Sequence, residues 1–125
     1  MSPRLLLVDD DEDIRTIARM SFERIGGWCV VDVPSGQDAL DAVSRDGPFD
    51  AVVLDVMMPG LDGPATLARL RGDGLPAEVP IVFLTAKVDR AACDRLVELG
   101  AAGTLRKPFD PVTLPHELER ALAPS

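Results

Sequence analysis

The stretch LLLVDDDEDIRTIARMSFERIGG, residues 5–27, contains the pattern on which the fold of the whole chain depends. Four consecutive apolar residues lead directly into five acidic ones, and apolar side chains then recur at helical spacing as far as Ile25. An unbroken apolar run suits a strand that is covered on both faces, as in a parallel sheet. Gly26-Gly27 ends the helical pattern. The stretch therefore predicts a strand followed by a helix over Asp11–Ile25.

Four further apolar runs alternate with amphipathic stretches along the chain. They are Trp28–Val31, Ala51–Leu54, Ile81–Leu84 and the weaker Ala101–Leu105. Five strand–helix units joined by short loops imply right-handed crossovers and an open sheet with helices on both faces. We therefore expect an α/β, flavodoxin-like (βα)5 doubly wound sandwich with a five-stranded parallel sheet of order 2-1-3-4-5. The length suits a single domain over residues 1–125, with its core at about residues 4–122.

The helical stretches carry recognisable ends and apolar anchors. Ser35 is the expected N-cap of a helix over Gln37–Ser44. Pro64 follows Asp62-Gly63 and Pro111 follows Asp110, and both prolines are expected in the first turns of helices. The apolar anchors of the last two helices are Leu96, Val97, Leu114, Leu118 and Leu122. The sequence therefore predicts a helix after each of the apolar runs.

The charge balance narrows the classes of function. Thirteen Lys and Arg residues oppose 21 Asp and Glu residues, which gives a net charge of -8. A field of that sign repels nucleic-acid phosphates but suits divalent cations and basic protein surfaces. We therefore expect no direct binding of DNA or RNA. The hydrophobic fraction of 46% and the charged fraction of 27% are typical of a soluble globular domain.

The remaining composition predicts a cytoplasmic protein that inserts into no membrane. Cys29 and Cys93 make no disulfide framework, and we expect both to be buried thiols. The run Leu5–Val8 is shorter than the core of a secretion signal, and no run approaches the roughly 18 residues that span a bilayer. His116, the only histidine, is expected to face solvent and to carry no phosphoryl group.

Residues that carry chemistry stand where the predicted strands end. These ends are Asp9-Asp10 after the first strand, Asp55 after the third, Thr85-Ala86 after the fourth and Lys107-Pro108-Phe109 after the fifth. In the expected order, strands 1, 3 and 4 are neighbours, so their ends lie about 5 Å apart. An extended lysine on strand 5 reaches inward over roughly 10 Å. Converging carboxylates repel one another unless a cation lies between them, and Mg²⁺ prefers such oxygen ligands.

These residues resemble the receiver domain of bacterial response regulators. The resemblance runs from about Arg4 to Leu122 and is carried by Val8-Asp9-Asp10, Leu54–Gly60, Leu84-Thr85-Ala86 and Lys107-Pro108-Phe109. It implies that Asp55 accepts a phosphoryl group from a histidine kinase or a histidine phosphotransfer protein, in a two-component system or phosphorelay. The phosphoryl group would later be lost by self-catalysed dephosphorylation. The chain would then be a signalling phosphoacceptor and not an enzyme that acts on other substrates.

The same resemblance implies roles for the other residues at the strand ends. The groups that would hold Mg²⁺ or Mn²⁺ are the side chains of Asp9, Asp10 and Asp55 and the backbone carbonyl of Met57. Thr85 would hydrogen-bond one phosphoryl oxygen and Lys107 would pair with another. The Lys107–Pro108 peptide bond would be cis. Phosphoryl transfer requires the charge on the phosphoryl oxygens to be neutralised, which a metal, a hydroxyl and an ammonium group supply.

The sequence departs from the family at one of the positions that govern switching. Thr104 stands three residues before Lys107, where the family usually has an aromatic ring, so we expect activation to proceed without that ring. Ala86 occupies a second switch position. Met57 and Lys87 stand two residues beyond Asp55 and Thr85, where they are expected to set the lifetime of the aspartyl phosphate.

The output of such a domain would be a surface. We expect it to bind a downstream effector or to form a homodimer through the fourth helix, fifth strand and fifth helix, whether the receiver stands alone or was excised from a larger protein. A metal-dependent phosphatase with a nucleophilic Asp is an alternative, but such enzymes place a second carboxylate where Met57 stands. A purely structural module would not need the acidic pair.

Overall fold

Strands and helices alternate strictly through the described part of the chain, residues 2–87 and 89–123 of a computed structural model. The strands are β1 (Arg4–Val8), β2 (Cys29–Val33), β3 (Ala51–Asp55), β4 (Ile81–Thr85) and β5 (Gly103–Arg106). The helices are α1 (Glu12–Arg24), α2 (Gly36–Asp46), α3 (Gly63–Gly72), α4 (Arg90–Glu98) and α5 (Leu114–Leu122). All strand pairs are parallel, in the order β2-β1-β3-β4-β5, which confirms the predicted fold class.

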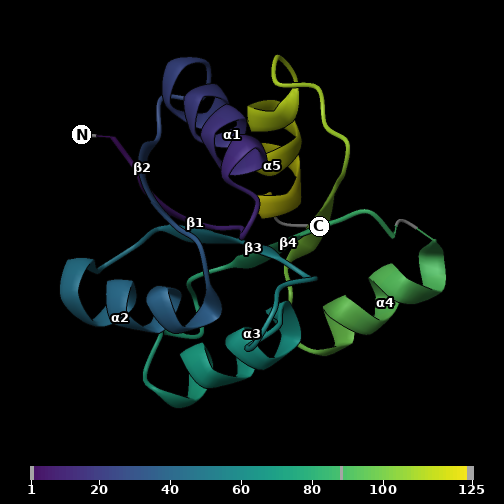
Figure 1. The fold of residues 1–125 in the computed structure, drawn as a ribbon. Helices are drawn as coiled ribbons and strands as arrows, with labels where there is room; N and C mark the ends of the chain where they lie inside the picture. Colours follow the sequence, from purple (N-terminus) through teal and green to yellow (C-terminus); the bar gives the residue numbers. More distant parts are fainter. Residues whose placement is uncertain (1, 88, 124–125) are drawn as a thin grey trace.

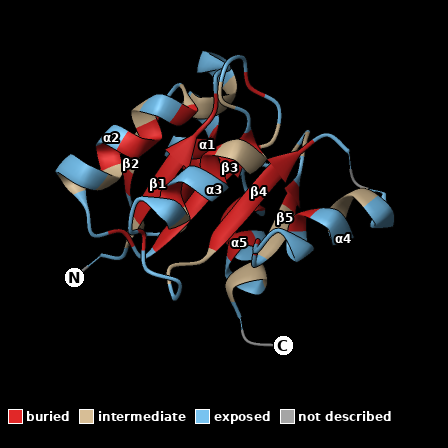
Figure 2. Ribbon diagram, turned by 90° about the horizontal axis from the view of Figure 1, so that it is seen from below, coloured by how far each residue is buried: buried red, intermediate tan, exposed pale blue. Residues whose placement is uncertain are grey.

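The helices cover both faces of the sheet. In Figure 1, α1 and α5 lie on one side, and α2, α3 and α4 lie on the other. Alternate residues of each strand point to opposite faces, so Leu5 and Leu7 join the core beneath α1 and α5, whereas Leu6 and Val8 join the core on the other side. Strands β3 and β4 are buried along their whole length (Figure 2). This double coverage explains why the strands read as unbroken apolar runs.

Several predicted helix ends are confirmed. Asp11 caps α1 by accepting hydrogen bonds from the backbone amides of Asp13 and Ile14, and Ser35 caps α2 by accepting one from Asp38. Pro64 lies in the first turn of α3 as expected. None of the helices within residues 2–87 and 89–123 combines the length and apolar character needed to cross a bilayer.

Two expectations for the helix ends and anchors are wrong. Pro111 is not in the first turn of α5, because the carbonyl of Asp110 accepts hydrogen bonds from the amides of Thr113 and Leu114 and so forms a separate turn first. Pro115 occupies the first turn instead. Val97 is 50% exposed, so Leu96 is the buried side chain of that pair.

The expectation of two buried thiols is also wrong. Cys29 is exposed because it begins β2, which lies at the edge of the sheet. Cys93 on α4 is half-buried, and its Sγ lies 3.5 Å from the hydroxyl of Thr104 on β5.

Gly63 allows α3 to approach the end of β3 closely. A Cβ atom there would lie 2.5 Å from the carbonyl oxygen of Asp55 and 2.8 Å from Cα of Val56. We expect Gly63→Ala to lower the free energy of unfolding by about 1–3 kcal/mol, the usual cost of overpacking. Urea unfolding monitored by circular dichroism measures this.

Gly72→Ala is the matched control, because a Cβ atom at Gly72 meets nothing within 4 Å. Alanine in the same helix is expected to leave stability unchanged or raise it by up to about 1 kcal/mol. Equal unfolding midpoints for the two variants would contradict the close contact between α3 and β3.

Candidate functional site

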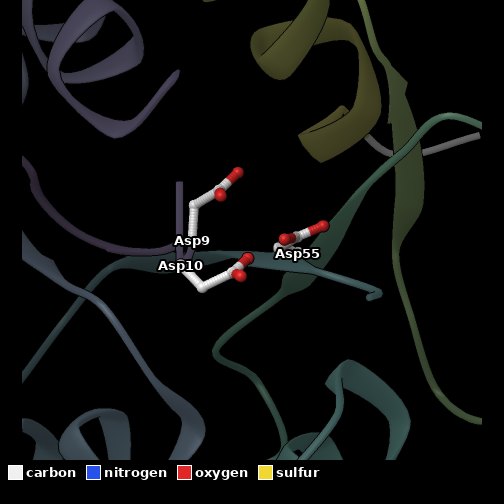
Figure 3. Close-up of side chains that lie close together, drawn as sticks. All are labelled: Asp9, Asp10 and Asp55. Atoms are coloured by element: carbon white, nitrogen blue, oxygen red, sulfur yellow. The ribbon is translucent and has the colours of Figure 1, made fainter. Parts of the chain in front are cut away.

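Three carboxylates meet at the carboxyl edge of the sheet. Asp55 is the last residue of β3, and Asp9 and Asp10 directly follow its neighbour β1. One oxygen from each of the three lies within 4.8 Å of the others. Figure 3 shows the three side chains gathered together, with Asp10 extending toward Asp55 and Asp9 beside them. The parallel register of β1 and β3 brings these residues together, since Val8 pairs with Leu54.

Asp9 is completely buried and held at several atoms. Its backbone amide donates to the carbonyl of Val33 at 3.2 Å, and its Oδ1 accepts from the amide of Asp11 at 2.9 Å. Its Oδ2 is paired with the ammonium group of Lys107, whose Nζ lies 2.9 Å away, and has no other polar partner among the described residues. A carboxylate oxygen has two lone pairs, so this one partner leaves Oδ2 able to bind a ligand as well.

Lys107 reaches into the acidic group from the end of β5. Its Nζ lies 2.9 Å from Oδ2 of Asp9 and 3.2 Å from Oδ1 of Asp55. Burial opposes the charge on Lys107, but the interactions with Asp9 and Asp55 outweigh it and raise the pKa of its ammonium group. The side chain is therefore a fixed positive charge. The Lys107–Pro108 peptide bond is cis, as the resemblance implies.

Asp55 is a buried carboxyl group whose pKa is raised above its ordinary value. It is 3% exposed, and its Oδ1 accepts a long hydrogen bond from the amide of Met57 at 3.4 Å. Burial raises the pKa of the Asp55 carboxyl from 3.8 to about 6; the charge of Asp9 adds to this effect and Lys107 opposes it. Charging Asp55 in the metal-free protein is therefore costly.

The arrangement fits a divalent cation. Three carboxylates against one ammonium leave an excess of negative charge in a largely buried place. All three offer the oxygen ligands that Mg²⁺ prefers. The observations that carry this fit are the convergence of three carboxylates beside a single ammonium group and the raised pKa of Asp55.

The other predicted site residues surround this group. Thr85 ends β4 and is buried; its hydroxyl accepts from the amide of Lys87 at 3.0 Å and donates to the carbonyl of Lys87 at 3.3 Å. Ala86, Lys87 and Met57 are exposed, with Met57 at 73%. His116 is exposed on α5, as expected.

Sequence reasoning missed one pair of residues beside the site. Arg15 on α1 donates to the backbone carbonyl of Asp9, and its guanidinium also contacts Asp32 on β2. The pairing joins residues that are 17 positions apart. In the sequence, Arg15 stands four residues after Asp11, which places both on one face of a helix. This spacing does not indicate that Asp32 is the partner of Arg15.

The raised pKa of Asp55 predicts how stability depends on pH without metal. Between pH 4 and 6 the folded chain keeps a proton on Asp55 that the unfolded chain has released, so this residue's contribution to stability falls as pH rises. Each pKa unit corresponds to about 1.4 kcal/mol, and solvent at the open edge of the sheet screens part of it, so we expect a loss of about 1–2 kcal/mol.

Urea unfolding of the wild type and of Asp55→Asn, each without metal at several pH values, isolates this contribution. The stability of the wild type relative to the variant should fall from pH 4 to 6 and then level off. A difference that stays constant across this range would contradict the raised pKa of Asp55.

Comparison with known proteins gives a consistent result. The family described as response regulator receiver domain matches residues 5–119. The response regulator MprA of Mycobacterium tuberculosis is 42% identical over 109 residues, which are 87% of this chain and 46% of that protein. The transcriptional regulatory protein CseB of Streptomyces coelicolor is 35% identical over 118 residues, 94% of this chain and 48% of that protein. The chain thus spans just under half the length of these relatives.

Solved structures agree with the fold. The chemotaxis protein CheY4 of Vibrio cholerae superposes with a TM-score of 0.88 at 30% identity, covering 98% of this chain and 100% of that one. The receiver domain of a Francisella response regulator gives a TM-score of 0.84 at 27% identity and covers 97% of both chains.

Proposed function

We propose that this chain, which belongs to the family of response regulator receiver domains, accepts a phosphoryl group on Asp55. Members of this family are signalling phosphoacceptors that bind Mg²⁺ at an acidic pocket. The observation that supports the proposal most strongly is the meeting of Asp9, Asp10 and Asp55 with Lys107 at one edge of the sheet. The donor would be a phosphohistidine on a histidine kinase or a histidine phosphotransfer protein.

The reaction moves a phosphoryl group from nitrogen to oxygen. A carboxylate oxygen of Asp55 attacks phosphorus, the new P–O bond forms as the P–N bond breaks, and the electron pair of that bond returns to the imidazole of the donor. Lys107 already lies 3.2 Å from Asp55 and would pair with a phosphoryl oxygen. Thr85 would release the backbone of Lys87 and hydrogen-bond a second oxygen.

Mg²⁺ would be held by Asp9, Asp10, Asp55 and the backbone carbonyl of Met57. When bound, it neutralises charge on the phosphoryl oxygens. The carboxylates of Asp9 and Asp10 supply the negative charge that retains a cation next to Asp55, and burial of Asp9 keeps its oxygen fixed. Water would later attack phosphorus and break the P–O bond, which releases phosphate and restores the Asp55 carboxylate.

The phosphorylated chain would act through its surface. Phosphorylation of a side chain adds about -1.5 to -2 charge at neutral pH and biases an equilibrium between two conformations. We propose that residues 1–125 form a single cytoplasmic receiver domain, with a core at about residues 4–122. It would bind an effector or a second copy through α4, β5 and α5. Thr104, which contacts Cys93 on α4, would make this response differ from that of relatives with an aromatic ring there.

Met57 and Lys87 are proposed to set the lifetime of the aspartyl phosphate. Both side chains are exposed beside the two strand ends that carry Asp55 and Thr85, so they flank the path of water to the site. We expect exchange of the two residues, Met57→Lys with Lys87→Met, to change the dephosphorylation rate severalfold. Phosphate release after removal of the donor measures the rate, and an unchanged rate would remove this role.

The proposal as a whole is tested by incubating the wild-type chain with acetyl phosphate and Mg²⁺. Intact-protein mass spectrometry should show addition of one phosphoryl group, and peptide mapping should place it on Asp55. Omission of Mg²⁺ should prevent the addition. A chain that stays unlabelled while binding Mg²⁺ would overturn the proposal.

A further inference from the structure

Arg15 on α1 bridges two different strand ends with one side chain. Its Nε lies 3.0 Å from Oδ2 of Asp32 on β2, and one terminal nitrogen donates to the backbone carbonyl of Asp9 at 2.8 Å. Both side chains of the pair are mostly buried, with exposed fractions of 16% for Arg15 and 20% for Asp32. A guanidinium group suits this bridge because its donors are fixed in one plane.

The carbonyl of Asp9 belongs to the peptide bond that joins Asp9 to Asp10. A peptide unit is planar, so holding its carbonyl oxygen also fixes where Asp10 begins. The amide of Asp9 is held by the carbonyl of Val33. The carboxylate of Asp9 accepts from the amide of Asp11, whose own side chain caps α1. Arg15 therefore completes a set of contacts that orient both members of the acidic pair.

We propose that Arg15, anchored by Asp32, is a positioning residue that holds the Asp9–Asp10 peptide in place and thereby sets the affinity of the site for Mg²⁺. This inference rests on the proposed function only for the identity of the cation. The effect is one of geometry: Arg15 itself is positive, so its charge alone would weaken cation binding rather than strengthen it.

Arg19 provides the internal comparison. It lies one helical turn further along α1 and pairs with the same carboxylate, 2.5 Å from Oδ1 of Asp32 and 3.3 Å from Glu23. Its side chain is 46% exposed and makes no hydrogen bond to Asp9 within the described residues. The two arginines therefore share Asp32, but Arg15 alone of the two contacts the acidic pair.

The experiment compares Arg15→Lys with Arg19→Lys. Both changes preserve the positive charge. A lysine at position 15 has only one nitrogen, so it cannot reproduce the two hydrogen bonds that the planar guanidinium group makes to Asp32 and to the carbonyl of Asp9. Two readouts are needed: Mg²⁺ affinity by calorimetry, and hydrogen exchange of the Asp11 amide by NMR in the metal-free protein. Loss of groups that orient metal ligands commonly costs about tenfold or more in metal affinity.

We expect Arg15→Lys to weaken Mg²⁺ binding about tenfold and to speed exchange of the Asp11 amide, while Arg19→Lys changes neither. Asp32→Asn should weaken binding in the same direction, and combining it with Arg15→Lys should add little, since both break one bridge. Thermal unfolding shows whether each variant is folded, and Asp32→Asn remains informative if Arg15→Lys is not.

The outcomes separate this inference from the proposed function. If Arg15→Lys and Asp32→Asn both bind Mg²⁺ as tightly as the wild type does, the positioning role of Arg15 is overturned. If the wild type itself takes up no Mg²⁺, the proposed function fails, and the exchange rate of the Asp11 amide still decides whether Arg15 holds the peptide.

Discussion

Asp55→Asn is expected to abolish phosphorylation of the chain by acetyl phosphate in the presence of Mg²⁺. The amide of asparagine lacks the anionic oxygen that attacks phosphorus, and it cannot form the acyl phosphate. The fold should survive, because removal of one charge relieves repulsion in the acidic group and Lys107 keeps its pairing with Asp9. Intact-protein mass spectrometry measures the labelled fraction, which should fall from a substantial value to none.

Asp62→Asn is the matched control for this change. Asp62 lies seven residues further along, carries the same charge and caps α3 by accepting a hydrogen bond from the amide of Ala65. Asparagine caps a helix about as well as aspartate, so this variant should label like the wild type. Comparable labelling of Asp55→Asn and the wild type would show that another residue is the acceptor.

The sheet and its edge could be predicted because they depend on short-range patterns. Each central strand is an apolar run covered on both faces, and the residue types at the strand ends follow directly from the chain order. Once the strand order was assumed, the meeting of Asp9, Asp10 and Asp55 followed from the geometry of parallel strands. These features need no knowledge of side-chain packing.

The errors arise where position in the whole sheet decides the outcome. Cys29 lies in an apolar run like those of the central strands, yet it is exposed because β2 is an edge strand. The contact of Cys93 with Thr104 joins α4 to β5 and depends on how the helix is placed over the sheet. The expected strand order already makes β2 an edge strand, but the sequence pattern does not report which residues of an edge strand are exposed.

The bridge from Arg15 to Asp32 was missed for a related reason. Local periodicity places Arg15 on α1 but gives no partner, because Asp32 belongs to a different strand. The effect of Arg15 on the site also depends on the backbone, because Arg15 donates a hydrogen bond to the main-chain carbonyl of Asp9. Every residue has such a carbonyl, so residue types alone do not predict this contact. Side chains that position a site through main-chain atoms are therefore the hardest part of a functional site to predict.

Asp9→Asn is expected to weaken Mg²⁺ binding by at least about tenfold, which corresponds to about 1.4 kcal/mol. Asp9 is completely buried, and its carboxylate is one of three that converge beside the single ammonium group of Lys107, so the group keeps an excess of negative charge for a cation. One unit charge interacts with another at about 4 Å with about 4 kcal/mol near a protein surface, and a doubly charged ion doubles this before desolvation is subtracted. Isothermal calorimetry of the metal-free protein measures the affinity.

Asp11→Asn separates the ligand role of Asp9 from the general charge of the acidic run. Asp11 lies two residues away and loses the same charge in the variant, but its carboxylate caps α1 and is not one of the three that converge. Because asparagine caps α1 about as well as aspartate, the variant should keep its fold and bind Mg²⁺ nearly as the wild type does. Should both variants lose affinity equally, the cation would be responding to the summed negative potential of residues 9–13 rather than to a site built around Asp9.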